Sequence, residues 1–138
     1  MENTVNTSQY DMIGAEEGVR KLVDRFYDLM DERSDVKPLR DMHAKSLRIS
    51  REKLFMFLSG WLGGPSIYIE KYGHPRLRQR HLPFAITSAE RDQWLSCMNQ
   101  TLEEQVSDPL LLQTLKTSFF NVANHMRNTQ DKDQNEGI

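Results

Sequence analysis

Histidine is the residue type in this sequence with the widest range of chemistry, and it occurs at positions 43, 74, 81 and 125. No two of these histidines are three or four residues apart, so the paired-histidine zinc motif of a helix is absent. The Gly63-Gly64-Pro65 stretch lacks the Lys and Ser/Thr of a phosphate-binding loop, and no nucleophile elbow is visible. The motifs of hydrolytic and phosphoryl-transfer enzymes are therefore missing.

His81 has the most informative surroundings. It follows Arg76-Leu77-Arg78-Gln79-Arg80 and precedes Leu82-Pro83-Phe84. A neutral imidazole nitrogen among apolar residues is what axial ligation of a haem iron requires, and neighbouring arginines suit the two haem carboxylates. A packed loop histidine is the commoner explanation for one histidine near a proline, so His81 taken alone leaves both interpretations open.

Basic side chains are concentrated in two places, although the formal net charge is only −2. Residues 37–53 carry six basic and two acidic side chains, and residues 71–80 carry four basic and no acidic ones, so each stretch is +4 and the remainder is −10. This distribution disfavours a globally basic nucleic-acid-binding protein. Two local sites that attract negative charge are expected instead.

Four helices are expected to position these residues, over 16–32, 50–62, 88–106 and 109–127. Apolar residues recur at helical spacing through each of them, and no stretch alternates with the period of a strand. Ser50 is the expected N-cap of the second helix, Thr87 and Glu90 form a capping box before the third, and Asp108-Pro109 begins the fourth. Residues 63–86 form a long connection, with one short helix near 76–82. The expected fold class is therefore all-α.

The size and composition fit one soluble globular domain. The chain has 138 residues with 38% hydrophobic and 28% charged, and no apolar run is long enough to span a membrane. We expect an N-terminal extension over 1–14, frayed over 1–7, a globular domain over 15–128 and a disordered tail over 129–138. Cys97 is the only cysteine and the N-terminus resembles no signal peptide, so a cytoplasmic location is expected.

A longer sequence pattern favours the interpretation of His81 as a haem ligand. The chain resembles the group II truncated haemoglobins from about Ile13 to Asn128, most specifically in Gly63-Gly64-Pro65, Tyr68, Gly73-His74-Pro75, Leu77-Arg78, Arg80-His81, Pro83-Phe84, Trp94-Leu95 and Cys97-Met98, and also in Phe26-Tyr27. The resemblance implies a two-over-two helical sandwich around haem b. The four expected long helices match that fold in number and order.

The resemblance also implies roles for individual residues. His81 corresponds to the proximal iron ligand, and Tyr27 and Trp94 correspond to distal residues that donate hydrogen bonds to a bound ligand. The implied propionate partners are Lys53, Tyr68, Arg78 and Arg80, and the implied apolar walls are Phe57, Leu58, Phe84, Ile86 and Met98. Without the resemblance, Tyr27 and Trp94 would be ordinary core residues on apolar helix faces.

Two distal positions, His43 and Leu54, depart from the usual pattern of the family. His43 lies where the family often has Phe or Tyr, so it could hydrogen-bond Tyr27 or coordinate the iron when no other ligand is present. A surface loop histidine is the alternative. Ser50 and Leu54 correspond to distal positions that face the haem, and Leu54 cannot donate a hydrogen bond. The distal polar network is therefore expected to depend on Tyr27, Trp94 and His43.

The expected function is binding of O₂, CO, NO and similar small ligands by haem b. Two donors would slow O₂ release, so redox chemistry, NO or peroxide detoxification, or sensing is favoured over bulk O₂ transport. Enzymatic activity of the NO-dioxygenase or peroxidase kind stays open, as does the identity of a reductase partner. The alternative is a haem-free helical module whose basic stretches bind an acidic partner. Basic residues that the propionates do not need are either solvated surface or a docking site for an acidic redox partner.

Overall fold

The computed structural model describes residues 7–130. Within them the helices are α1 (Gln9–Met12), α2 (Ala15–Glu32), the 3-10 turn η1 (Ser34–Val36), α3 (Lys37–Asp41), α4 (Arg48–Trp61), α5 (Ile67–Tyr72), α6 (Leu77–His81), α7 (Ser88–Gln105) and α8 (Pro109–His125). No strand occurs in this part of the chain, so the all-α prediction is confirmed there. None of the described helices has the length and apolar character needed to cross a membrane. Most of the expected frayed start and of the expected tail lies outside the described residues.

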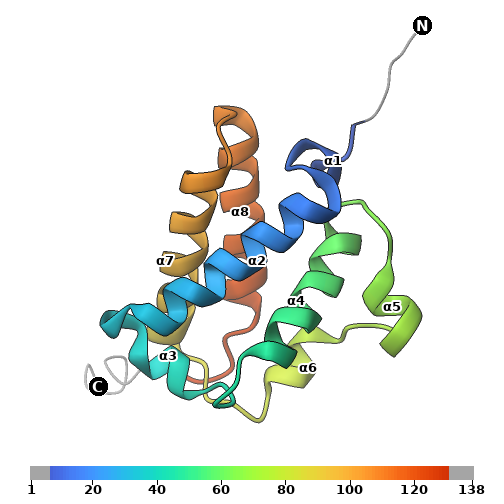
Figure 1. Ribbon diagram of the computed structural model, residues 1–138. Coiled ribbons are helices and arrows are strands. Elements are labelled where there is room, and N and C mark those ends of the chain that lie inside the picture. The colour runs from blue at the N-terminus through green and yellow to red at the C-terminus, as the bar shows by residue number, and fades with distance from the viewer. Residues whose placement is uncertain (1–6, 131–138) are drawn as a thin grey trace, which may run out of the picture.

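Two pairs of long helices form the sandwich. In Figure 1, α7 and α8 run side by side and α2 crosses in front of them, with α4 next to α2. The apolar stripe of α2 is buried between the two pairs, and the largest fully buried side chains come from this seam: Phe26, Leu22 and Met30 from α2, Leu58 from α4, Met98 and Leu102 from α7 and Leu115 from α8. Because apolar residues at i, i+3 and i+4 share one helix face, the sequence pattern leads directly to this packing.

Helix capping explains where two of the four long helices begin. Thr87 and Glu90 form the expected capping box at α7, with the Thr87 backbone N donating to Glu90 Oε1 at 2.7 Å. Asp108 Oδ1 accepts from the backbone N of Leu110 at 2.9 Å, with Pro109 in the first turn of α8. The prediction that Ser50 caps α4 is wrong. That helix begins two residues earlier, at Arg48, because Leu47 is already its N-cap.

The connection over residues 63–86 contains two short helices, α5 and α6. The expected helix near 76–82 corresponds to α6, whereas α5 was not expected. Gly73 has φ +83° between them, a conformation that favours glycine. The segment turns there, and α6 lies below the N-terminal turns of α4 (Figure 1).

Candidate functional site

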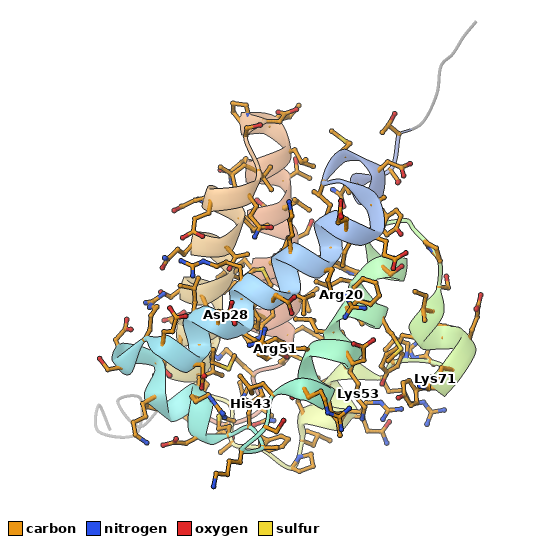
Figure 2. The ribbon with its side chains drawn as sticks, in the orientation of Figure 1. Arg20, Asp28, His43, Arg51, Lys53 and Lys71 are labelled. Atoms are coloured by element: carbon orange, nitrogen blue, oxygen red, sulfur yellow. The ribbon has the colours of Figure 1, made fainter. Side chains whose placement is uncertain are left out.

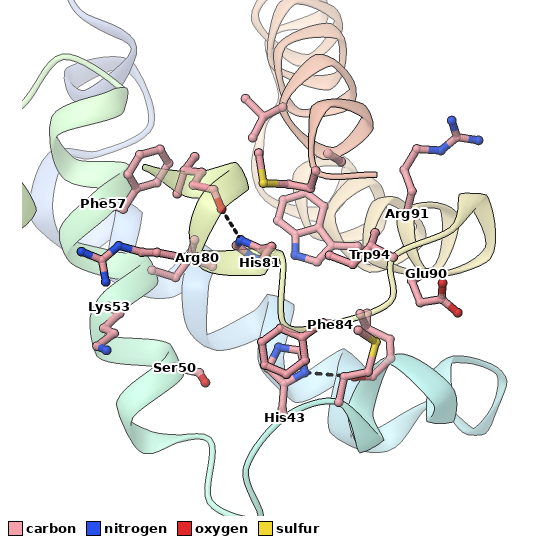
Figure 3. Close-up of a pocket in the computed structure, with 18 of the residues that line it drawn as sticks. His43, Ser50, Lys53, Phe57, Arg80, His81, Phe84, Glu90, Arg91 and Trp94 are labelled. Carbon is pink, nitrogen blue, oxygen red and sulfur yellow. Dashed lines mark hydrogen bonds between the residues drawn. The ribbon is translucent and has the colours of Figure 1, made fainter. Parts of the chain in front are cut away.

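A cavity of about 590 Å³ opens between α4, α6 and the α7/α8 pair. Figure 3 shows side chains from these elements converging on it. Most of the site residues that the sequence predicts line this cavity: Tyr27, His43, Ser50, Lys53, Leu54, Phe57, Leu58, Tyr68, Arg80, His81, Phe84, Ile86 and Trp94. Residues spread over nearly seventy positions of the chain are thus brought together.

His81 lies at the end of α6, and its imidazole orientation is determined by the backbone. Its Nδ1 is 2.7 Å from the carbonyl oxygen of Leu77, one helical turn earlier. A carbonyl oxygen can only accept, so Nδ1 carries the proton and Nε2 keeps its lone pair. No described residue hydrogen-bonds Nε2, and Figure 3 shows the ring at the wall of the cavity. Histidines that bind metals are commonly oriented by this type of carbonyl contact.

The loop before α6 is held by its own polar side chains. The backbone N of Arg76 donates to Nδ1 of His74 at 3.1 Å, and Arg80 Nε donates to the carbonyl oxygen of Pro75 at 2.7 Å. On the other side, Asn128 Nδ2 donates to the His81 carbonyl oxygen at 3.1 Å. His74 thus helps to hold the conformation of the loop. The contacts of Arg80 and Asn128 hold the position of His81 at the cavity wall.

Tyr27 and Trp94 both pack against the buried ring of Phe26. The Phe26 centroid is 4.9 Å from that of Tyr27 and 5.0 Å from that of Trp94. Burial raises the pKa of the Tyr27 hydroxyl well above its ordinary value, against the opposing effects of Arg51 and of a hydrogen bond with Ser50. Tyr27 therefore stays a neutral phenol that can donate a hydrogen bond. Ser50 contributes from the first turn of α4 and not from a capping position.

His43 lies at the opposite side of the opening from α6 (Figure 3) and has the same local geometry as His81. Its Nδ1 is 3.0 Å from the Leu39 carbonyl oxygen, again four residues earlier. Burial lowers its pKa, which favours the neutral ring. The ring meets Tyr27 edge to face, with centroids 6.0 Å apart. His43 is half-buried at the cavity wall and is not a surface loop residue.

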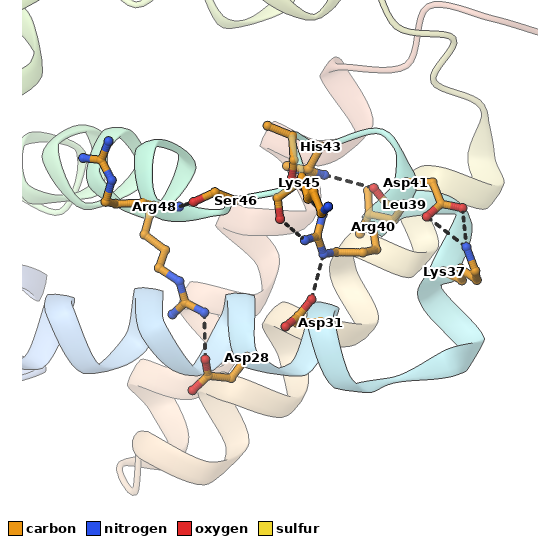
Figure 4. Close-up of polar contacts among 12 residues, drawn as sticks. Asp28, Asp31, Lys37, Leu39, Arg40, Asp41, His43, Lys45, Ser46 and Arg48 are labelled. Atoms are coloured by element: carbon orange, nitrogen blue, oxygen red, sulfur yellow. Dashed lines mark hydrogen bonds and ion pairs between the residues drawn. The ribbon is translucent and has the colours of Figure 1, made fainter.

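Arg40 holds the segment that carries His43. Its guanidinium donates to the carbonyl oxygens of Ala44 at 3.0 Å and Lys45 at 2.7 Å and pairs with Asp31 at 2.9 Å. Figure 4 shows these contacts joining the segment after α3 to the end of α2. One arginine therefore connects the loop of His43 to the main helix of the core.

Two predicted residues lie away from the cavity lining. Arg78 Nε and Nη2 donate to the carbonyl oxygens of His125 at 3.2 Å and Arg127 at 3.1 Å, so this arginine binds the end of α8 and does not face the cavity. Met98 is fully buried in the core between the helix pairs. The apolar spacing of a helix predicts that a residue such as Met98 is buried. It does not tell whether the residue faces the core or the cavity.

Some lining residues were not predicted as site residues: Leu39, Met42, Ala44, Trp61, Leu77, Glu90, Arg91, Phe119, Val122, Ala123 and Met126. Several of them continue the apolar faces of α4 and α8, where Trp61 and Phe119 pack with centroids 4.8 Å apart. Their periodicity predicted burial correctly, but it carried no signal that a cavity would interrupt the core at these positions.

The chemistry of this cavity fits a haem. The walls are mainly apolar, as a porphyrin ring requires, and the volume lies in the usual range of about 300–1,000 Å³ for ligand sites. His81 supplies one imidazole with a free Nε2 lone pair. Lys53 and Arg80 supply two cations at the α4/α6 edge, where two carboxylates would need them (Figure 3).

Comparisons with known proteins agree with this chemistry. Residues 8–128 match the family model described as bacterial-like globin. The chain is 43% identical over 94 residues to the group 2 truncated hemoglobin YjbI of Bacillus subtilis, and the match covers 68% of each of the two chains. It is also similar to the cold-adapted truncated hemoglobin of Pseudoalteromonas haloplanktis, with 48% identity, a TM-score of 0.88 and coverage of 89% of this chain and 99% of that one. The group II 2-on-2 hemoglobin of Agrobacterium tumefaciens has 37% identity, a TM-score of 0.89 and coverage of 94% and 100%.

Proposed function

This chain belongs to the bacterial-like globin family, whose haem binds small ligands, and we propose that it is a haem b protein whose iron is held by His81. The observation that carries the proposal is the contact between His81 Nδ1 and the Leu77 carbonyl oxygen. In the neutral ring this contact fixes the tautomer in which Nε2 keeps its lone pair, and His81 lines the cavity. A histidine that binds a metal commonly donates its other ring N–H to a carbonyl oxygen in this way.

The haem would supply an iron with a coordination position open to O₂, CO, NO or a similar small ligand. Around it, this chain's own residues have separate tasks. Lys53 and Arg80, with Tyr68 beside them, neutralise the propionates at the cavity edge. Phe57, Leu58, Phe84 and Ile86 exclude water from the ring. Ser50 orients the Tyr27 hydroxyl, and Leu54 adds an apolar surface without a donor.

Tyr27 and Trp94 provide donors on the distal side. Bound O₂ carries partial negative charge, so a phenol and an indole N–H both favour its retention. Donors worth about 0.5–1.5 kcal/mol each slow release by roughly one to two decades together. Slow release suits redox chemistry on O₂ or peroxide, NO detoxification or sensing better than bulk transport. We also propose a cytoplasmic location, because the single Cys97 is a buried free thiol.

The two half-buried histidines support a further step in this proposal. His43 has a neutral ring with Nδ1 occupied by Leu39, so its Nε2 also keeps a lone pair at the cavity wall. We propose that His43 coordinates the ferric iron when no exogenous ligand is present. The contacts of Arg40 with the Ala44 and Lys45 carbonyl oxygens hold the segment that carries His43.

The decisive experiment is the optical spectrum of the purified protein and of His81→Ala. We expect a red protein with a Soret band in ferric, ferrous and CO-bound forms. We expect His81→Ala to lose the band and added imidazole to restore part of it. His125→Ala is the matched control, because His125 is exposed at the end of α8. A colourless protein that ignores added haemin would support the alternative, a haem-free module that binds an acidic partner through its basic stretches.

A further inference from the structure

Among the described residues, some Lys and Arg side chains form ion pairs with carboxylates and others do not. Every Lys and Arg within α2, α3, α7 and α8 except Lys21 forms an ion pair, for example Arg25 with Glu104 and Lys116 with Glu103. Between residues 45 and 80 only Arg51 does so. Among the described residues, the cations of this segment without a carboxylate partner are Lys45, Arg48, Lys53, Lys71, Arg76, Arg78 and Arg80. The described cations that lack a carboxylate partner are therefore concentrated in one stretch of the chain.

Three of these cations gather on one surface, which we call the basic face: Lys53, Lys71 and Arg80. Lys53 Nζ and Lys71 Nζ are each 5.5 Å from the centroid of the Tyr72 ring. Arg80 Cζ is 5.9 Å from the Tyr68 centroid, and the two tyrosine rings are 4.9 Å apart. Figure 2 shows Lys53 and Lys71 on the same side of the molecule, on α4 and α5. The basic face therefore spans α4, α5 and α6.

The basic face borders the cavity, since Lys53 and Arg80 also line it. Two propionates would neutralise two positive charges at most, so the face keeps positive charge when haem is bound. Tyr72 is 40% exposed and Ile69 is 53% exposed on the same short helix. Exposed aromatic side chains such as Tyr72 are enriched in protein–protein interfaces.

The charge distribution of the whole chain also favours a protein partner. Residues 42–82 carry eight basic and two acidic side chains, which is +6, so the rest of the chain is −8 for a net charge of −2. Such a charge asymmetry orients an acidic protein onto the basic face during approach and raises its rate of association. A long polyanion such as RNA would meet the surrounding negative surface as well.

We propose that Lys53, Lys71 and Arg80 dock the acidic surface of a small electron-transfer protein at the edge of the cavity. This inference rests on the proposed function as a haem protein, because the docked partner would deliver an electron to the iron. In that step one electron leaves a reduced [2Fe–2S] cluster and converts Fe(III) to Fe(II). The cluster is oxidised by one electron and no proton is transferred.

The test compares Lys71→Glu with Lys21→Glu. Lys71 belongs to the basic face but does not line the cavity. Lys21 lies on α2 and forms no ion pair among the described residues. Its carbonyl oxygen accepts a hydrogen bond from the side chain of Gln105 on α7. Both substitutions change the net charge equally. The probe is a plant-type [2Fe–2S] ferredoxin, titrated in its oxidised form into the holoprotein at low ionic strength and followed by nuclear magnetic resonance. We expect Lys71→Glu to weaken binding about three- to tenfold and Lys21→Glu to leave it unchanged.

Reduction kinetics provide the second measurement. We expect reduced ferredoxin to reduce the ferric wild type faster than Lys71→Glu by the same factor, with a rate that falls as salt is added. Photoreduced deazariboflavin, which is uncharged, should reduce both proteins equally. Equal binding of ferredoxin by wild type and Lys71→Glu would overturn the proposal. So would equal weakening by Lys21→Glu, or tighter binding of a single-stranded oligoribonucleotide.

The two hypotheses fail in different ways. If the protein has no Soret band, the proposed function fails, whatever the binding of ferredoxin. If the band is present and ferredoxin does not bind, only the docking proposal fails.

Discussion

One backbone contact recurs at both histidines of the cavity. His81 and His43 each direct Nδ1 at the carbonyl oxygen four residues earlier, and each ends a short helix or lies just beyond one. The Leu39 carbonyl oxygen also accepts from the backbone N of Met42 at 3.1 Å. A carbonyl oxygen has two lone pairs, so it can accept from the imidazole in addition to a backbone N–H. The contact with the carbonyl oxygen sets the tautomer of each imidazole.

Spin state tests the proposal for His43. We expect the ferric protein to show a low-spin spectrum with a contribution from His43, and His43→Ala to become high-spin. Electron paramagnetic resonance measures both states, with His125→Ala as the control. A wholly high-spin, water-ligated wild type that His43→Ala leaves unchanged would contradict the proposal.

Trp94→Phe tests the contribution of the indole donor. The phenyl ring keeps part of the packing on Phe26 and Phe119 but removes the N–H. A donor worth about 0.5–1.5 kcal/mol predicts that O₂ leaves roughly two- to twelvefold faster. Stopped-flow displacement of O₂ by CO measures this rate, and Tyr72→Phe, outside the cavity lining, is the control. Unchanged release from Trp94→Phe would show that the indole does not retain O₂.

The pKa of Tyr27, raised by burial, predicts a loss of stability at alkaline pH. Below the ordinary pKa of 10.0, Tyr27 is neutral in both the folded and the unfolded chain. Above it, the unfolded chain ionises first and is stabilised, so the free energy of unfolding falls by about 1.4 kcal/mol per pH unit from this group. Urea unfolding at several pH values should show this fall in wild type relative to Tyr27→Phe. Parallel curves for the two proteins would exclude the effect.

At the scale of elements, two arginines join α2 and α4: Arg20, which pairs with Glu52 at 2.9 Å, and Arg51. Arg51 Nη2 is 2.8 Å from Asp28 Oδ1, and Nη1 is 3.2 Å from Asp24 Oδ1 and 3.1 Å from the Asp24 carbonyl oxygen. The guanidinium also lies 5.9 Å from the Tyr27 ring. Because Tyr27 and Ser50 are on these two helices, their relative position depends on how α4 packs against α2.

Arg51→Met tests this connection. We expect it to lower the free energy of unfolding by about 1–2 kcal/mol, because a three-quarters-buried guanidinium loses several hydrogen bonds while Asp24 and Asp28 are hydrated again. Lys37→Met breaks the exposed pair of Lys37 with Asp41 and should cost less than about 0.5 kcal/mol. Urea denaturation measures both. Equal costs would mean that Arg51 acts only as another surface charge.

At the scale of the whole molecule, the N-terminal segment before α2 is packed onto the body of the protein. The backbone N of Tyr10 donates to the Leu62 carbonyl oxygen at 2.8 Å. The Tyr10 ring lies so close to Gly64 that a Cβ there would be 2.5 Å from its Cγ. Position 64, in the turn after α4, therefore has no room for a side chain, because the ring of Tyr10 occupies that space.

A double-mutant cycle tests this contact. We expect Gly64→Ala to destabilise the protein by about 1–3 kcal/mol, because the methyl group displaces the Tyr10 ring. In a Tyr10→Ala background the same substitution should cost almost nothing, since the ring is gone. Thermal unfolding of the four proteins gives the coupling energy. If both backgrounds lose the same stability, strain at Gly64 itself is the cause.

The long helices were predictable from the sequence, whereas of the short ones only α6 was predicted. The four long helices were predicted to within two residues at either end, because a stripe of five or more apolar residues defines a helical face. The capping residues Thr87 and Asp108 fixed two of their starts. By contrast, α1, α3 and α5 have four to six residues, too few for periodicity, and Ser50 was misassigned because a serine near a helix start is equally suitable inside the first turn.

The sequence by itself determined the helical class, the family resemblance and the expected role of His81, because these depend on local spacing and on a motif confined to residues 63–98. Only the tertiary structure decided which residues share the cavity. Arg78 and Arg80 are two positions apart on one short helix, yet Arg80 lines the cavity and Arg78 binds the end of α8. The spacing of two places them on different helix faces, and which face meets the cavity depends on how α6 packs against α4 and α8. The same packing determines which cations have carboxylate partners and which remain exposed.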